Sequence, residues 1–507
     1  MRSKPNKQAA NVLMAKAKPA AAVSMQTQFQ LAVSFHSQGR WQDAAILYDS
    51  IIAAQPAHAD ASHMRGLLDA QLGDQAQAVM RISQAIALNA TKSAYFNNRG
   101  LAFLAQQNYA EALDDFQQAI TLEPGLAQAH CNLGNVLQEL LRFEEALICF
   151  DRAIKLQPDY ADAYFNKGNL WVIFKRLDKA IEDFDRALVF SPDDADYKYN
   201  KSIALLTNGQ YESGWELHES RWDRLSTKHH RRQFSATLWL GHENIKNKKI
   251  LLYAEQGLGD SIQFIRYVPM VIELGAQVFV KIQSPLIQLF KGMEDAITWI
   301  KKGEALPIVD FHCPLMSLPL AFKTRLDNIP SFPSYLLCDQ AKKKVWENKL
   351  GPKNKPRIGI VWSGSSIHKN DRNRSISLDI FKSIISDEAV FYSLQNEYRA
   401  HDVGLIHDIP EIIDTSDQLQ DFSDTASLCD LMDLIITVDT SVAHLSGALG
   451  KTTWVLVPHN PDFRWFNDRQ DSPWYPSIKL FRQNSFHDWN QTLIQLSLDL
   501  KKFIATK

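Results

Sequence analysis

A buried apolar run late in the chain ends in residues that could bind an anion. The segment ITVDTSVAHLSGALGK, residues 436–451, places Asp439, Thr440 and Ser441 directly after the run, and His444 follows in a small-residue helical pattern. Asp or Thr at a helix start can satisfy free backbone N–H groups. The same helix start offers N–H donors and the positive end of the helix dipole to an anion. From the residues alone, a helix cap and an anion site formed by Thr440, Ser441 and His444 both remain open.

The end of this segment, GALGKTT, does not fit a nucleotide-binding phosphate loop. That loop requires a glycine where Leu445 stands, and it requires a strand, a loop and a helix in that order. Here the glycine–lysine pair ends a helix and precedes a strand. Gly450 is therefore predicted to cap the helix C-terminus.

A second loop of interest is YAEQGLGDSIQFIRY, residues 253–267. Gly257 and Gly259 are separated by one residue, and Asp260 opens a predicted helix. The glycines allow the backbone to approach a ligand closely, but Ile262 stands where the dinucleotide fingerprint needs its third glycine. Asp260 is either an N-cap or an acid that faces a cleft, and both interpretations stay open.

The third loop is GIVWSGSSIHKNDRNRSISL, residues 359–378. An apolar run opens into a Ser/Gly turn, and His368, Lys369, Arg372 and Arg374 follow. Lys and Arg side chains bind phosphate oxygens. The loop is either a phosphate-binding loop or a solvated basic loop.

These three loops follow predicted strands. From residue 248 onward, short apolar runs alternate with helical patterns, and the runs are KILLYA, AQVFVKI, RIGIVWSG, VFYSLQ, DLIITVD and TTWVLVP. Such runs are typical of buried parallel strands, and the alternation predicts a doubly wound α/β architecture. Ligands bind beyond the carboxyl ends of the strands in such sheets, which is where the loops lie. A C-terminal segment, WNQTLIQLSLDLKKF, is predicted to be a helix.

The first half of the chain repeats every 34 residues, the spacing of tetratricopeptide (TPR) repeats. Three clear units begin at residues 93, 127 and 161, two weaker units begin at 25 and 59, and a degenerate capping unit follows at 195. Each clear unit carries Gly, Ala, Phe, Ala and Pro at matching positions. Small residues let paired helices approach, and proline ends the second helix. The pattern predicts an all-α solenoid with a concave face suited to a peptide or protein.

Charge and cysteine content narrow the possible partners. The chain of 507 residues has a net charge of −2, so no global attraction to nucleic acid or anionic membrane is expected. Residues 25–194 contain 13 basic and 21 acidic side chains, which disfavours nucleic acid as the ligand of the repeats. The five cysteines show no CxxC spacing, so we expect no zinc site, no disulfide framework and a reducing cytoplasmic location. No apolar stretch is long enough to predict a membrane span.

The sequence predicts six segments. They are a disordered basic tail (1–24), the TPR solenoid (25–224), a linker (225–247), a first α/β lobe (248–338), an interlobe linker (339–355) and a second α/β lobe (356–507). Motifs of zinc hydrolases, serine hydrolases and kinases are absent from the sequence, and so is an acidic metal cluster.

The C-terminal half resembles a GT-B glycosyltransferase, with two Rossmann-like lobes and a cleft between them. It is similar to the glycosyltransferase family 9 enzymes, which include heptosyltransferases, and the whole plan resembles bacterial TPR proteins fused to such a domain and the O-GlcNAc transferases. The resemblance is carried by AEQGLGDSIQFIRY, GIVWSGSSIHKNDRNRSISL, DLIITVDTSVAHLSGALGK and DRQDSPWYPSIKLFRQ.

The resemblance implies roles for individual residues. It makes Asp260 the catalytic base, and it assigns contacts with a nucleotide-sugar donor to Gly257, Gly259, Lys369, Arg374, Thr440, Ser441 and His444. It implies an inverting transfer without a bound metal or other cofactor, since the nucleotide sugar is a co-substrate. It also implies a C-terminal helix that crosses back onto the first lobe.

The acceptor and the activity itself remain open between three hypotheses. The first is transfer to a protein bound by the repeats, with flagellin as one such acceptor. The second is a TPR interaction scaffold with an inactive GT-B domain. The third is transfer to a glycan or lipopolysaccharide, with the repeats used for assembly.

Overall fold

The computed structural model describes residues 24–227, 234–255, 257–293, 295–368 and 370–507. The chain forms two compact units that divide between Leu170 and Trp171. The first unit consists of helical repeats, and the second contains the last repeats and two β-sheets. Of the predicted tail at 1–24, residues 1–23 lie outside the described residues, and so do residues 228–233 of the predicted linker.

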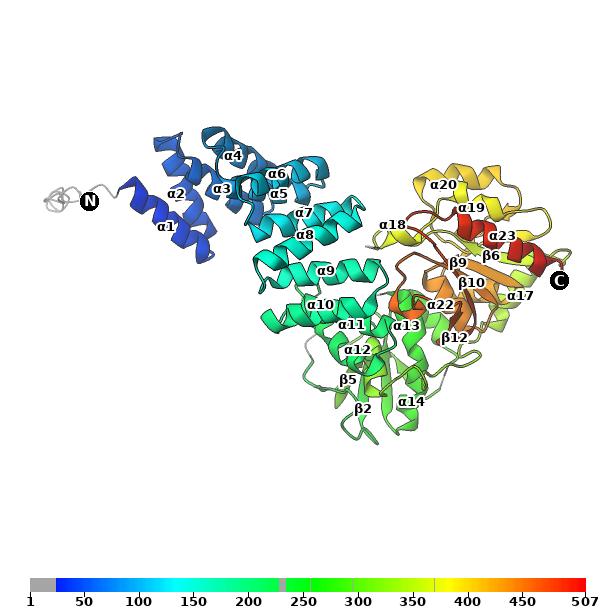
Figure 1. The fold of residues 1–507 in the computed structure, drawn as a ribbon. Coiled ribbons are helices and arrows are strands. Elements are labelled where there is room, and N and C mark those ends of the chain that lie inside the picture. Colours follow the sequence, from blue (N-terminus) through cyan, green and yellow to red (C-terminus); the bar gives the residue numbers. More distant parts are fainter. Residues whose placement is uncertain (1–23, 228–233, 256, 294, 369) are drawn as a thin grey trace, which may run out of the picture. The chain divides into compact units, whose positions relative to one another are not determined.

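The first unit is a row of helix pairs joined by tight turns (Figure 1). The first helix of each pair has 13 residues and the second has 14, which repeats the 34-residue period of the sequence. The helices are α1 (Met25–Ser37), α2 (Trp41–Ala54), α3 (Ala59–Gln71), α4 (Gln75–Leu88), α5 (Ser93–Ala105), α6 (Tyr109–Leu122), α7 (Ala127–Glu139), α8 (Phe143–Leu156) and α9 (Ala161–Ile173).

Glycine is required in these pairs because a phenylalanine ring occupies the space beside it. A Cβ atom on Gly100 would lie 2.8 Å from Phe116, and one on Gly134 would lie 2.6 Å from Phe150. The ring therefore packs first within its own repeat. It also reaches the next repeat, since Phe116 shares a cluster with Val136.

The second unit begins with the last repeats and their cap. These are α10 (Leu177–Phe190), α11 (Ala195–Thr207), α12 (Tyr211–His218) and a short 3-10 helix, η1 (Glu219–Trp222). Leu206, Tyr211 and Trp215 are at most 2% exposed and belong to the same core cluster as the sheet residues. The repeat pattern extends to residue 224, but its last turns pack as part of the α/β unit.

The first sheet has five parallel strands in the order β1-β5-β2-β3-β4 and forms what we call the N-lobe, residues 234–338. Its β1 lies within the segment predicted as a linker. The elements are β1 (Thr237–Leu238), β2 (Lys249–Tyr253), α13 (Leu258–Phe264), α14 (Val268–Glu273), β3 (Gln277–Lys281), α15 (Ile287–Phe290), β4 (Ile297–Trp299), β5 (Phe311–Pro314) and α16 (Leu318–Ala321).

The second sheet has seven strands in the order β11-β12-β10-β9-β6-β7-β8 and forms the C-lobe, residues 356–507. All its pairs are parallel except β11–β12. The elements are β6 (Arg357–Val361), α18 (Asp371–Arg374), α19 (Leu378–Phe381), β7 (Val390–Ser393), α20 (Ala400–Leu405), β8 (Ile412–Ile413), α21 (Phe422–Asp430), β9 (Leu434–Val438), α22 (Ser441–Ala448), β10 (Thr453–Val457), η9 (Phe463–Trp465), β11 (Asp471–Ser472), β12 (Tyr475–Arg482) and α23 (Asn490–Ile504).

The longest apolar runs of the sequence form strands that are buried throughout. Every residue of β6, β9 and β10 is buried, as expected of parallel strands covered on both faces. These strands confirm the predicted α/β architecture of the second half. The segment 339–355, predicted as a linker, contains a helix, α17 (Gln340–Leu350), which buries Trp346 and begins at the capping carboxylate of Asp339.

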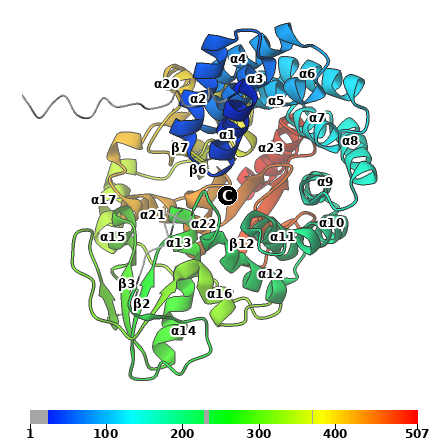
Figure 2. The same ribbon diagram turned by 90° about the vertical axis from the view of Figure 1, so that its left-hand side faces the viewer.

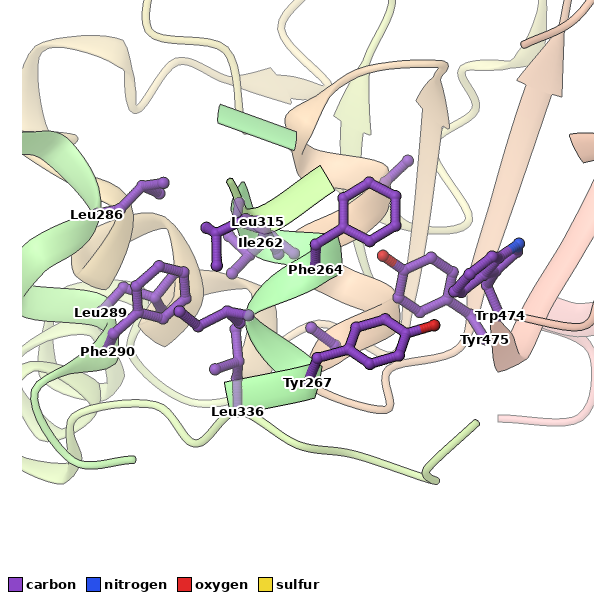
Figure 3. Packing of buried hydrophobic residues seen from close by; sticks show 14 of the residues in the cluster. Ile262, Phe264, Tyr267, Leu286, Leu289, Phe290, Leu315, Leu336, Trp474 and Tyr475 are labelled. Atoms are coloured by element: carbon purple, nitrogen blue, oxygen red, sulfur yellow. The ribbon is translucent and has the colours of Figure 1, made fainter. Parts of the chain in front are cut away.

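One hydrophobic cluster joins the two lobes. Figure 3 shows Phe264 and Tyr267 of the N-lobe packed beside Trp474 and Tyr475 of the C-lobe. A second cluster fills the other face of the C-lobe sheet, and α23 packs its leucines there, against residues such as Phe381 and Trp454. The C-terminal helix thus covers the C-lobe core rather than crossing back onto the first lobe, because its apolar stripe of Leu493, Leu496 and Leu500 is buried in that cluster.

Candidate functional site

The helices that follow β2 and β9 meet where the two lobes join. Helices α13 and α22 lie side by side (Figures 1 and 2). A Cβ atom on Gly259 would lie 2.7 Å from His444 Cδ2 and 3.5 Å from Ser441 Cα. Glycine at 259 therefore permits this close approach, which brings the loop of residues 257–260 against the start of α22.

Asp260 sits at the third position of α13, on this junction. Its Oδ2 accepts a hydrogen bond from the Gly257 N–H at 3.1 Å, so the side chain does serve the helix start. Its Oδ1 forms an ion pair with Arg464, which comes from the C-lobe. The carboxylate keeps 25% of its exposure, so it has a helix-capping contact, an interlobe contact and access to solvent.

Arg464 ties the two lobes together. It lies in η9, in the loop that follows β10, and its side chain is 7% exposed. Its guanidinium contacts Asp260 and the Gln263 side chain of the N-lobe, and it donates to Asp462 of its own loop at 2.7 Å. The three partners fix the guanidinium plane between the lobes.

The start of α22 is capped by its own chain. The Thr440 Oγ1 accepts from the Val442 N–H at 3.3 Å and lies 3.1 Å from Thr437 Oγ1. Thr440 is 9% exposed, so its hydroxyl serves the capping role that the sequence left open. Ser441 is the first residue of the helix and is half-buried.

His444 is held in the packing between the lobes. Its Nδ1 lies 2.9 Å from the Tyr475 hydroxyl, and its ring stacks on Trp465 with centroids 5.4 Å apart. Burial and the positive charges of Arg464 and Arg266 lower the pKa of His444 well below its usual value. The ring is therefore neutral at physiological pH, and it supports the α13–α22 contact.

Arg374 reaches the same corner from α18. Its Nη1 donates to the Asp439 carbonyl oxygen at 2.8 Å, and the side chain is 13% exposed. The side chain has room because Gly364 lacks a Cβ atom, which would lie 2.6 Å from Arg374 Nη2. The basic loop and the end of β9 thus meet, as their shared edge of the sheet predicts.

Two carboxyl groups at the junction have raised pKa values. Burial raises the pKa of Asp260, and Arg464 opposes that effect. Burial and the nearby Asp462 raise the pKa of Asp439, while contacts with Trp465 and Arg374 oppose the rise. A carboxylate with a raised pKa is a better proton acceptor than an ordinary one, and such shifts are typical of functional sites.

The cap of the solenoid supports the loop that carries Asp260. Arg221 of η1 donates two hydrogen bonds of 2.8 Å to Glu255, at the end of β2, and one of 2.7 Å to Ser317. It also pairs with Glu219 at 2.6 Å. Both members of the Arg221–Glu255 pair are buried, so the last repeat fixes the position at which the loop leaves the sheet.

The structure brings together most residues that the sequence indicated. Asp260, Gly259, Ser441, His444 and Arg374 converge on the α13–α22 junction or its rim. Gly257 is the N-cap of α13, where an added Cβ would lie 2.7 Å from Asp260 Oδ2. Lys369 lies outside the described residues.

Sequence reasoning missed Arg464 and Arg221. Arg464 is separated from Asp260 by 204 residues, and Arg221 from Glu255 by 34. One sequence signal pointed to Arg464. It lies in PHNPDFRWF, a loop that follows a buried strand at the carboxyl edge of the sheet. Arg221 carried no comparable signal, because it lies in a degenerate repeat.

Within the described ranges, no group of three or more His, Cys, Asp or Glu side chains is arranged to hold a metal ion. Across those same residues, every helix is too short or too polar to cross a membrane.

Comparisons with known proteins identify the repeats. A tetratricopeptide repeat model matches residues 131–195, and a TPR repeat model matches residues 100–140. Protein FlbA of Caulobacter vibrioides is 24% identical over 331 residues, which cover 60% of this chain and 54% of that protein. The chain thus spans about half the length of this relative.

Solved structures of TPR proteins resemble the solenoid only in part. MamA is 22% identical with a TM-score of 0.30 and covers 33% of this chain and 98% of its own. A thermophilic TPR protein of Thermus thermophilus is 21% identical with a TM-score of 0.33, and covers 36% of this chain and 100% of its own. The prediction of TPR repeats in the N-terminal half is confirmed by the matching repeat models, and residues 100–195 are tetratricopeptide repeats.

Proposed function

We propose that the second unit is a glycosyltransferase of GT-B architecture that moves a sugar from a nucleotide-sugar donor to an acceptor hydroxyl. The observation that carries the proposal is the meeting of the loop that carries Asp260 with the start of α22 at the junction of two α/β lobes. In open α/β sheets this edge is where ligands bind. The sequence resemblance to family 9 glycosyltransferases points to the same loops.

The chemistry uses two sides of this junction. The acceptor hydroxyl attacks the anomeric carbon, its proton passes to Asp260 as general base, and the bond between the sugar and the nucleoside diphosphate breaks. The raised pKa of Asp260 suits that role. Attack opposite the departing diphosphate inverts the anomeric configuration.

The departing diphosphate needs positive groups. Arg374 lies beside Asp439 at the end of β9, and the positive end of the α22 dipole lies next to it. Together they would stabilise the leaving group without a metal. Lys369 and Ser441 remain proposed donor contacts.

The acceptor is proposed to be a polypeptide held by the repeats, with flagellin as one candidate. Successive first helices carry asparagines 34 residues apart, and each contacts a side chain 35 residues earlier. The pairs are Asn98–His63 at 2.9 Å, Asn132–Asn97 at 2.9 Å and Asn166–Cys131 at 3.5 Å. An amide has two N–H donors and two acceptor lone pairs, so this row can also bond an extended peptide backbone.

A calorimetric screen of UDP-, ADP-, GDP- and CMP-sugars tests the donor site. A ligand present at a hundred times its Kd should stabilise the folded chain by about 2.7 kcal/mol. Arg374→Ala should weaken the binding of that donor about tenfold or more, because a charged hydrogen bond is lost. Arg325→Ala, which removes an arginine that is 58% exposed, is the matched control and should bind as the wild type does.

A second candidate function is favoured by the confirmed repeats: a TPR scaffold that binds proteins and carries a catalytically inactive α/β unit. Failure of every nucleotide and nucleotide sugar to bind the full chain would support that function. Transfer to a glycan or lipopolysaccharide is the third. Transfer to a purified glycan, with no transfer to any protein tested, would support it.

A further inference from the structure

A cavity of about 700 Å³ lies at the turns of the last repeats. Three segments line it: the turn before α10 with the first residues of that helix (175–179), the last residue of α11 with the turn after it (207–209) and the loop after η9 (466–469), with Leu326 beside them. Asp260 is not among its lining residues. The proposed sugar transfer leaves this cavity without a role.

Basic side chains dominate the cavity wall. The wall carries Lys175, Arg176, Lys179 and Arg469 against two acids, Asp178 and Asp468, and Arg469 is paired with Asp471 at 2.6 Å. Asp178 accepts a hydrogen bond of 3.0 Å from Asn208. The cavity wall therefore has an excess of positive charge, whereas the whole chain has a net charge of −2.

Lys175 occupies a backbone position that usually favours glycine. Its φ is +56°, and the equivalent turn position is left-handed in all six units, held by Gly39, Gly73 and Gly209 in three of them and by Gln107 and Leu141 in two others. A left-handed lysine costs free energy that a glycine avoids. Its ammonium group is also partly desolvated, since burial and Arg482 lower the pKa of Lys175.

The distribution of the charges favours a polymer over a small ion. Arg176 and Lys179 are exposed, and the four cationic residues lie on two segments of the wall, three at 175–179 and Arg469 in the loop after η9. A small anion needs a converging set of donors, whereas an extended chain with several carboxylates can contact dispersed cations one by one. We propose that this cavity binds an acidic stretch of polypeptide.

One loop connects this cavity with the proposed active site. The wall residues Phe466 and Arg469 follow directly on η9, which carries Arg464. Arg482 holds this loop by donating to the carbonyl oxygens of Phe466 at 2.8 Å and Arg469 at 2.6 Å. Peptide binding at this cavity does not depend on sugar transfer, and it is measurable without a donor.

Fluorescence anisotropy with the full chain and a labelled decaglutamate peptide tests the inference. The double variant Arg176→Glu/Lys179→Glu should bind the peptide about tenfold more weakly or worse, because two attractive charges become repulsive. The matched control is Lys301→Glu/Lys302→Glu, which makes the same charge change at exposed positions outside the cavity. It should bind within about twofold of the wild type, and both variants should keep the wild-type Tm, since all four positions are exposed.

Three results would overturn the inference. The first is no binding of decaglutamate by the wild type at millimolar concentration. The second is an equal loss in both double variants, which would mean attraction to overall charge. The third is displacement of the peptide by inorganic pyrophosphate at similar concentrations, which would mean a small-anion site. Peptide binding that weakens with added salt and survives pyrophosphate supports the inference.

Discussion

At the scale of single residues, Arg464 opposes the effect of burial on the pKa of Asp260. Arg464 is 7% exposed and Asp260 25% exposed in this ion pair, so the cation favours the ionised carboxylate while partial burial disfavours it. A general base must be deprotonated to act. The rate of transfer should therefore rise with pH through the pKa of Asp260 and then level off.

Replacing Arg464 by Gln should move that rise to higher pH. Loss of the cation removes the effect that opposes burial, so the pKa of Asp260 increases further. The measurement is kcat/KM against pH for the wild type and the variant. Arg464→Lys retains the charge and should show a smaller displacement.

Arg325→Gln removes an exposed arginine that pairs with Asp327, and it should leave the pH profile in place. An Arg464→Gln profile that coincides with the wild-type profile would show that Asp260 is not the group whose titration limits the rate.

The limits of sequence reasoning are clearest for these residues. Asp260 and Arg374 were indicated because each follows a strand in a loop of suitable composition. Arg464 gained its role from a partner 204 residues away, a distance over which no local pattern operates. His444 was placed correctly at the helix start, but its use in stacking on Trp465 depends on a loop that the sequence did not connect to it.

At the scale of elements, the junction depends on how closely α13 approaches α22. The absence of a side chain at Gly259 sets that distance, since a Cβ atom there would lie 2.7 Å from His444. His444 cannot move aside easily, because Tyr475 and Trp465 hold its ring.

Gly259→Ala should therefore lower stability by about 1–3 kcal/mol, the usual cost of overpacking. Displacement of Asp260 from its place should also lower kcat/KM by about a hundredfold. Chemical denaturation and steady-state kinetics measure the two effects. Gly404→Ala is the control, because a Cβ atom at that position meets nothing within 4 Å.

An equal response to the two glycine substitutions would argue that the α13–α22 contact has no special role.

Among elements, the repeats and the buried strands were predictable because their signals are local: a fixed period in one case and continuous apolar runs in the other. Helix α17 was missed because charged residues surround its one buried side chain, Trp346, and strand β1 was missed because it has two residues and neither is buried.

At the scale of the whole molecule, the end of the repeat pattern and the edge of the compact unit do not coincide. The repeat sequence continues to residue 224, yet the compact units divide between Leu170 and Trp171. Trp215 and Tyr211 are 2% exposed in the core shared with the lobes, and Arg221 is paired with Glu255 beside the candidate site.

Two truncations should behave differently for this reason. A chain that begins at Ala161 keeps α10 to η1 and should unfold in one cooperative transition with donor binding intact. A chain that begins at Leu225 loses those buried side chains, each worth about 3–5 kcal/mol when removed, and leaves Glu255 buried without Arg221. It should be unfolded or strongly destabilised.

Circular dichroism melting curves of the two truncated chains make the comparison. A chain from Leu225 that melts as cooperatively and at the same temperature as the chain from Ala161 would contradict the view that the last repeats are part of the α/β unit.

The most direct test of the central claim is sugar transfer by Asp260→Asn with the donor found in the binding screen. We expect this variant to bind the donor with an affinity near that of the wild type but to transfer the sugar about a hundredfold to ten-thousandfold more slowly, because a general base is lost. Asp327→Asn, at a side chain that is 73% exposed, should transfer normally. An Asp260→Asn variant that transfers the sugar at the wild-type rate would contradict the claim that the α13–α22 junction is the site of the reaction.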